Sequence, residues 1–145
     1  MWKFEHTITT TAKVETIWKL YSDITTWTEW DKGVVHASLE GAFTQGTKGI
    51  LQPAGQEPLH FELTDVQPFR RFSDVTDIPA LGIQVCFTHL LSESQEGTRI
   101  SHKVQIIGPN ADQVGPKFGA HMVDGIPQTM ESLASLALDK ERHYA

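Results

Sequence analysis

The sequence is poor in the residues that build several common kinds of site. Its one cysteine, Cys86, excludes an internal disulfide and a cysteine-based zinc site. Its one asparagine, Asn110, is followed by Ala-Asp and is therefore no glycosylation acceptor. No apolar run approaches the roughly 20 residues of a membrane span. The first residues alternate and carry charge, so we expect no signal peptide and a cytoplasmic protein.

Basic residues are also scarce and scattered. The chain has 12 Lys and Arg against 18 Asp and Glu, a formal net charge of −6, and Arg70-Arg71 is the one adjacent basic pair. A phosphate-binding surface needs clustered cations, so we predict no nucleic-acid partner. The 145 residues, 39% of them hydrophobic, are enough for a single domain, 1–145, with its own core.

Hydrophobic periodicity predicts the order of the elements. Residues 2–9 alternate apolar and polar, as in a half-buried strand. Val14, Ile17, Trp18 and Tyr21 follow at helical spacing, and 24–30 forms a second short helix or turn. The period of two then returns for about seventy residues. The predicted strands are 34–40, 47–53, 58–67, 70–77, 81–93 and 98–107.

The tail reads as a helix with an interruption. Its apolar stripe consists of Met122, Ile126, Met130, Leu133 and Leu136. Asn110 and Gln113 have the spacing of a capping box, and Pro116 suits a first helical turn. Four residues disfavour a continuous helix, and we expect a kink or a separate turn among them. They are Gly115, Gly119, Gly125 and Pro127.

This order predicts an α+β fold. Six consecutive antiparallel strands form a meander whose apolar face needs a cover, and the amphipathic C-terminal helix can supply it. A sheet that curves around one helix often leaves a cavity between the two.

Three groups of residues resemble a known family. They are 14–18 (VETIW) with Asp23, Trp27 and Trp30; 40–43 (EGAF) with 46–49 (GTKG) and Pro53; and 87–89 (FTH) with 97–100 (GTRI) and 108–109 (GP). Together they resemble the START-like, SRPBCC superfamily, particularly its polyketide cyclase/dehydrase-type bacterial members, over essentially the whole chain.

The resemblance implies a helix-grip fold, in which a seven-stranded antiparallel sheet wraps around a long C-terminal helix and two short helices follow strand 1. It also implies an apolar pocket for a lipid, polyketide, hormone or other hydrophobic molecule. Some relatives are cyclases or aromatases, some carry ligands, and others bind protein partners. They share no catalytic residue set, so the resemblance assigns none here.

Two apparent motifs fail on geometry. The segment 41–48 resembles a phosphate loop, but Thr47 separates Gly46 from the lysine and a strand pattern follows, so a bulged connection fits better. Cys86 and His89, three apart on one strand, point to opposite faces, as do Ser101 and His102. Without a Gly-x-Ser-x-Gly elbow, nucleophilic catalysis has no support.

The histidines form a pattern across strands. A tight turn at 94–97 places His89 opposite His102, and it pairs apolar residues on either side, which supports the register. Those pairs are Leu91 with Ile100, Phe87 with Val104, and Val85 with Ile106. His6 lies on the matching face of the first strand, which the resembled topology places beside the last.

Three interpretations of these histidines remain open. They are core residues satisfied by backbone or water, polar anchors in an apolar pocket, or metal ligands. His121 on the C-terminal helix could join these histidines under any of the three interpretations. No local spacing supports a metal site, so we predict neither a metal nor a cofactor. His36, His60 and His143 are expected at the surface.

The aromatic and methionine residues also have two interpretations. Trp18, Trp27 and Trp30 suit a ligand clamp, but aromatics at helical spacing usually form core. Met122 and Met130 read as core filler that also suits an adaptable pocket wall.

We therefore predict a protein that binds a hydrophobic, lipid- or polyketide-like molecule between the sheet and the C-terminal helix. A cyclase- or dehydratase-type enzyme with a pocket histidine as acid or base is one alternative, and a protein-interaction module is another. The ligand, any reaction and the oligomeric state stay open. The predicted ligand-binding residues are His6, Val85, Phe87, His89, His102, Val104, His121, Met122 and Ile126.

Overall fold

A computed structural model gives the structure of residues 1–144. Its strands are β1 (Trp2–Thr10), β2 (Val34–Leu39), β3 (Lys48–Pro53), β4 (Leu59–Gln67), β5 (Arg71–Ile78), β6 (Ile83–Ser94) and β7 (Gly97–Ile107). Its α-helices are α1 (Val14–Ser22), α2 (Trp27–Trp30), α3 (Ala111–Val114), α4 (Ala120–Val123) and α5 (Ile126–Tyr144). Three short turns of other helix types complete it: η1 (Ile24–Thr26), η2 (Pro79–Leu81) and the π-helical η3 (Gly115–Gly119).

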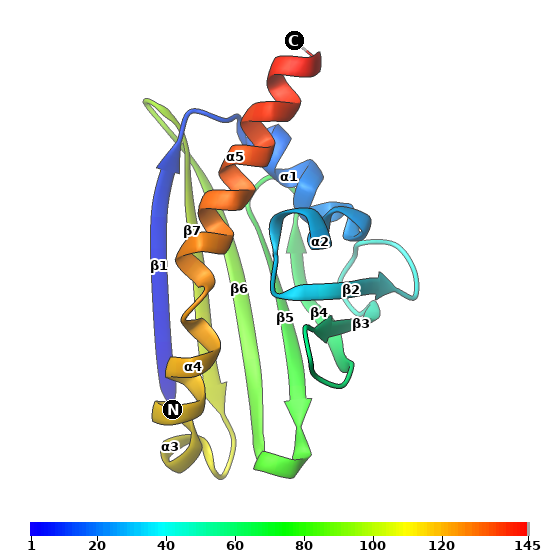
Figure 1. Cartoon of the computed structure of the whole chain (residues 1–145), viewed down its shortest axis with the longest axis vertical. Helices are drawn as coiled ribbons and strands as arrows, with labels where there is room; N and C mark the ends of the chain where they lie inside the picture. The colour runs from blue at the N-terminus through cyan, green and yellow to red at the C-terminus, as the bar shows by residue number, and fades with distance from the viewer. Residues whose placement is uncertain (145) are drawn as a thin grey trace.

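The seven strands form one antiparallel sheet in the order β1-β7-β6-β5-β4-β3-β2. The C-terminal helices run along one face of this sheet, in front of β1 and β7, with α1 and α2 beside α5 (Figure 1). α5 packs against α1, α2 and β1. The predicted α+β helix-grip fold, with two short helices after strand 1, is confirmed.

The predicted strands agree with the observed ones to within two residues. The largest difference is the start of β6, predicted at 81 and observed at Ile83. Its cause is local, because Pro79–Leu81 form a 3-10 turn that ends at Gly82 in the left-handed conformation, with φ of 68°.

The β6–β7 hairpin has the predicted register. Ser94 pairs with Gly97, and His89 is the direct partner of His102. Gly97 has a φ of 142°, a value that favours glycine, and a Cβ there would clash with the carbonyl of Thr10. The glycine therefore allows the hairpin to pass close to the end of β1.

The tail is interrupted where its glycines lie. α3, η3 and α4 follow one another as short pieces, and α5 begins only after Gly125. Gly119 is needed for close packing, since a Cβ there would lie 2.7 Å from the Trp2 ring. The predicted capping box is wrong, because the Asn110 side chain donates to the carbonyl of Leu81, 3.0 Å away, instead of capping α3.

The core consists of two apolar clusters on the inner face of the sheet. The α1–α5 cluster joins α1, α2 and α5 to the sheet through Ile17, Trp18, Tyr21, Trp27, Trp30, Phe61, Leu63, Phe72, Leu91, Ile100, Met130 and Leu133, among others. The α3–α4 cluster holds Ile83, Val85, Val104, Ile106, Ala111 and Val123. Both clusters reach the middle of the sheet, and Ile126 packs against each of them.

The tryptophans of the α1–α5 cluster are core residues. Trp18, Trp27 and Trp30 are all buried. Phe43, from the β2–β3 connection that resembles a phosphate loop, packs edge-on against Trp18 and Phe72. This connection therefore closes one end of the core, and its apolar contacts explain the aromatic side chain among its glycines.

Candidate functional site

A row of three histidines crosses the inner face of the sheet. Cα pairing places His6 on β1 beside His102 on β7, then His89 on β6, and then Phe72 on β5. The rings of His89 and His102 lie 4.6 Å apart between centroids at 74°. The sequence therefore predicted this neighbourhood correctly, including the position of His6.

The helix that meets the row is α1. The Tyr21 hydroxyl shares a buried hydrogen bond of 2.7 Å with Nε2 of His102. Tyr21 has no exposed surface and His102 is 6% exposed. The helical spacing predicts only that Tyr21 lies on the apolar side of α1, and its hydrogen bond to His102 comes from the packing of the fold.

His89 is held mainly by stacking. Its ring lies parallel to that of Phe72, with 3.9 Å between centroids and 7° between planes. Nδ1 donates a long hydrogen bond of 3.4 Å to the Phe72 carbonyl, so Nε2 is the nitrogen left to accept from another group. His89 is only partly buried, whereas His102 is almost completely enclosed.

His89 and His102 are neutral groups near pH 7. Burial lowers the pKa of His89 to about 4. Burial also lowers the pKa of His102 well below its ordinary value, and neighbouring His89 and His6 lower it further. Burial raises the pKa of Tyr21. His89 and His102 therefore offer hydrogen-bonding groups without charge, which suits the orientation of a neutral ligand group better than proton abstraction.

Asp74 is a functional candidate that the sequence analysis missed. It lies on β5 beside Phe87, two residues from Phe72 and therefore on the same inner face. It is 7% exposed, and burial raises its pKa to about 7. The alternation of Phe72, Asp74 and Thr76 in the sequence was the available signal, since it places a carboxylate at an inward position.

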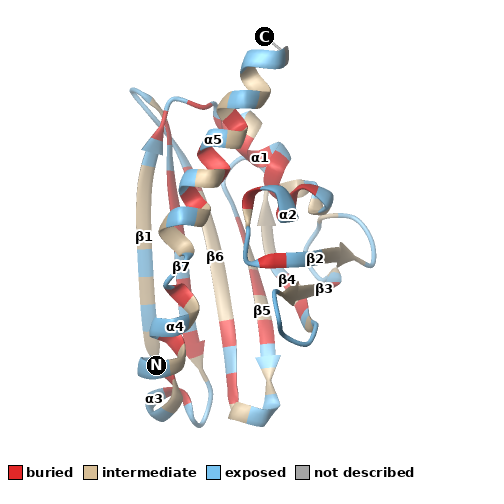
Figure 2. Ribbon diagram, in the orientation of Figure 1, coloured by how far each residue is buried: buried red, intermediate tan, exposed pale blue. Residues whose placement is uncertain are grey.

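The predicted apolar residues surround the middle of the same face. Val85 and Val104 are buried in the α3–α4 cluster, and Phe87, Met122 and Ile126 pack against it while staying partly exposed. Along the inner face of β6, Phe87 and His89 are partly exposed, whereas Val85 and Leu91 on either side are buried. Figure 2 shows this change along β6. Solvent therefore reaches the inner face near the junction of the two clusters.

His121 is the predicted site residue that the structure places apart. It is exposed on α4, so it does not extend the buried part of the histidine row. His36, His60 and His143 are exposed, as expected. Within residues 1–144, no group of three or more His, Cys, Asp or Glu side chains is arranged to hold a metal ion.

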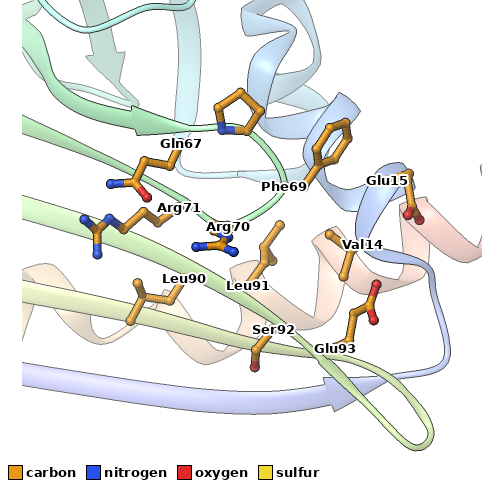
Figure 3. A pocket seen from close by; sticks show the side chains of 11 residues that line it. Val14, Glu15, Gln67, Phe69, Arg70, Arg71, Leu90, Leu91, Ser92 and Glu93 are labelled. Carbon is orange, nitrogen blue, oxygen red and sulfur yellow. The ribbon is translucent and has the colours of Figure 1, made fainter.

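Two depressions stand out on the protein, and neither contains a predicted ligand-binding residue. The first, of about 680 Å³, lies at the β4–β5 turn beside the start of α1. Figure 3 shows its mixed lining, with Arg71 and Gln67 on one side, Glu15 and Glu93 on the other, and Phe69 toward Glu15. The second, of about 280 Å³, lies at the ends of β5 and β6.

The Tyr21–His102 hydrogen bond should contribute measurably to stability. His102→Phe removes one partner and leaves the buried phenol unsatisfied, so we expect a loss of about 1–3 kcal/mol in the free energy of unfolding. Tyr21→Phe with His102→Phe removes both polar groups and should recover part of that loss. Urea unfolding of the wild type, both single variants and the double variant measures the coupling. Additive single effects would contradict it.

Comparison with known proteins agrees with this architecture. The family model described as "Polyketide cyclase / dehydrase and lipid transport" matches residues 1–137, so the chain belongs to this family. The resemblance to the START-like, SRPBCC superfamily is thereby confirmed. No curated protein matches the chain in sequence.

Solved structures share the fold at low sequence identity. Protein MLL2253 from Mesorhizobium loti has a TM-score of 0.74 at 21% identity, over 95% of this chain and 97% of that one. Ara h 8.0201 has a TM-score of 0.70 at 12% identity, over 94% and 97%. Norcoclaurine synthase from Thalictrum flavum, solved with a transition-state analogue, has a TM-score of 0.71 at 14% identity, over 96% and 95%.

The family supports a role in binding hydrophobic ligands. None of the helices in residues 1–144 has the length and apolar character needed to cross a membrane.

Proposed function

We propose that the protein binds a hydrophobic small molecule on the inner face of the sheet, between β5–β6 and the C-terminal helices. One observation carries the proposal. The inner side chains in the middle of β6, Phe87 and His89, are partly exposed, although those at both neighbouring inward positions are buried. An apolar molecule at this point would complete the burial of Phe87, Met122 and Ile126.

The chemistry of this face suits such a ligand. Apolar side chains make up most of it, and a few polar groups lie at one side: His89, the Tyr21–His102 pair and Asp74. Small-molecule sites commonly combine apolar walls with a few placed polar groups that fix orientation. The break between α4 and α5 at Gly125 supplies a point where the helical cover can adjust to a ligand.

Acid–base catalysis is the second candidate, and Asp74 favours it. A carboxyl whose pKa is about 7 is poised to give or take a proton near neutral pH. His89, with a pKa of about 4, is a weak base at that pH. If the protein is an enzyme, Asp74 is therefore a better acid–base group than the histidines.

The binding proposal predicts saturable uptake of a neutral hydrophobic dye. We expect N-phenyl-1-naphthylamine to gain fluorescence with the protein, to saturate near one equivalent, and to be displaced by 1-decanol. Phe87→Glu puts a charge at the site and should weaken dye binding at least about tenfold, because charge must be desolvated there. Gln84→Glu, which adds the same charge at an exposed position of β6, should leave binding unchanged.

Dye binding without saturation, or equal affinity in Phe87→Glu and the wild type, would contradict the proposed site.

Native mass spectrometry of the protein purified from its own host then distinguishes ligand carriage from acid–base catalysis. A co-purified apolar molecule that stays unchanged on incubation indicates carriage, and one that is converted indicates catalysis.

A further inference from the structure

Asp74 lies in a row of apolar residues across the sheet. Its direct neighbours are Leu63 on β4 and Phe87 on β6, and the row continues through Val104 on β7 to Phe4 on β1. An ionised carboxylate among such neighbours loses hydration that the apolar side chains cannot replace. Asp74 therefore needs a polar partner from somewhere else.

Residues 1–144 provide no such partner. Asp74 has no hydrogen bond and no ion pair among them, and burial is the one cause of its raised pKa. Among the described residues, no side-chain oxygen or nitrogen is both fully enclosed and without a hydrogen bond. Since the oxygens of Asp74 make no hydrogen bond, they keep some contact with solvent. The carboxyl is thus more than nine-tenths buried, unpartnered and still accessible.

The groups around Asp74 leave it as the source of negative charge on this face. His89 and His102 are held neutral by burial, and so is Tyr21 from α1. Burial raises the pKa of the Cys86 thiol on β6, and the charge of Asp74 raises it further. The α5 side chains that pack on the core at the near end, Ile126 and Met130, do not titrate. None of these groups supplies a positive charge to Asp74, so a cationic group of a ligand would find the carboxylate unpaired.

We propose that Asp74 makes this site select hydrophobic molecules that carry an amine, with the ammonium group seated against the carboxylate and the apolar part along Phe87. This inference rests on the proposed function. A neutral ligand group that donates a hydrogen bond would need only an acceptor, which Nε2 of His89 already offers. The carboxylate adds charge. The net charge of −6 also draws cations toward the protein.

The test compares three ligands of one chain length as competitors of N-phenyl-1-naphthylamine: decylamine, 1-decanol and decanoic acid, in amine-free buffer at pH 8. We expect decylamine to bind at least about tenfold more tightly than 1-decanol, and decanoic acid most weakly. In Asp74→Asn, decylamine should fall to the affinity of 1-decanol, whose own affinity should stay unchanged. Asp77→Asn removes the same charge from an exposed position of β5 and should change nothing.

The pH dependence gives a second readout. Decylamine stays protonated across this range, and only the ionised form of Asp74 pairs with it. Because the pKa of Asp74 is about 7, the affinity of decylamine should rise by about five- to tenfold from pH 6 to pH 8, while the affinity of 1-decanol stays constant.

Two outcomes would overturn the inference. One is equal binding of decylamine and 1-decanol by the wild type, and the other is an amine preference that survives Asp74→Asn. Both leave the proposed function intact, because 1-decanol still binds. Failure of the dye and of 1-decanol to bind at all would instead refute the proposed function.

Discussion

Leu133→Asp should remove most of the stability of the protein. Leu133 lies in the middle of α5, has no exposed surface and belongs to the α1–α5 cluster. The variant loses a leucine from the core and places an unpaired carboxylate there. The expected cost is several kcal/mol, comparable with the whole free energy of unfolding of a domain of this size. Thermal unfolding followed by circular dichroism should show a melting temperature lower by more than about 10 °C.

Ser135→Asp is the matched control for this variant. Ser135 is exposed on the same helix, so the same negative charge lies in water and should change stability by less than about 0.5 kcal/mol. Equal melting temperatures for Leu133→Asp and Ser135→Asp would mean that α5 does not hold the sheet as the packing indicates.

The strands and the histidine row could be predicted because each rests on a short-range rule. Alternation identifies the inner residues of a strand, and the tight turn at 94–97 fixes the register of β6 against β7. A slip of one residue would have turned His89 or His102 to the outer face and paired apolar with polar side chains. The observed pairs show that this constraint was sufficient.

The partners of the row could not be predicted in the same way. Tyr21 follows the apolar pattern of α1, and the pattern shows that it faces the core without showing which strand residue it meets. Trp18 on α1 packs against Phe43 and Phe72, which come from separate parts of the chain, and such contacts form only in the folded protein. A hydrogen bond across 81 residues is a result of that packing.

The tail shows a similar limit. The spacing of Asn110 and Gln113 fits a capping box, but the side chain of Asn110 has a competing acceptor in the carbonyl of Leu81, which becomes available only when the η2 turn folds beside it. Local helix signals predicted the interruption of the tail correctly, because glycine and proline act within their own segment.

The sequence pattern indicates that Asp74 faces inward, but it does not show that the carboxyl lacks a polar partner. This lack of a partner predicts a large effect on stability. Asp74→Asn should stabilise the protein at pH 8 by on the order of 4 kcal/mol, because the folded state raises the pKa of Asp74 from 3.8 to about 7. Below about pH 3 the carboxyl is neutral in both the folded and the unfolded chain, so the two proteins should be nearly equally stable there.

The sign follows from proton binding. Between pH 3.8 and 7 the folded protein holds a proton on Asp74 that the unfolded chain has released, so this residue lowers stability as the pH rises. His89 and His102 act in the opposite direction, since their lowered pKa values make the fold lose stability as the pH falls below 6.5. Wild-type stability alone therefore mixes three effects, and the difference between the wild type and Asp74→Asn isolates that of Asp74.

Urea unfolding of both proteins at pH 4, 6 and 8 measures this difference. It should grow steadily with pH, and Asp77→Asn should show no comparable trend, because Asp77 is exposed on the opposite face of β5. A constant difference from pH 4 to pH 8 would mean that Asp74 is ionised as easily in the folded protein as in the unfolded chain, and the case for an unpartnered carboxyl would fail.

If the difference does grow, the wild-type protein is less stable near neutral pH because it keeps a carboxylate at this position. A ligand cation bound to the folded state would restore that stability, since anything that binds the folded form alone raises the free energy of unfolding. Decylamine should therefore narrow the gap between the wild type and Asp74→Asn at pH 8, and 1-decanol should not.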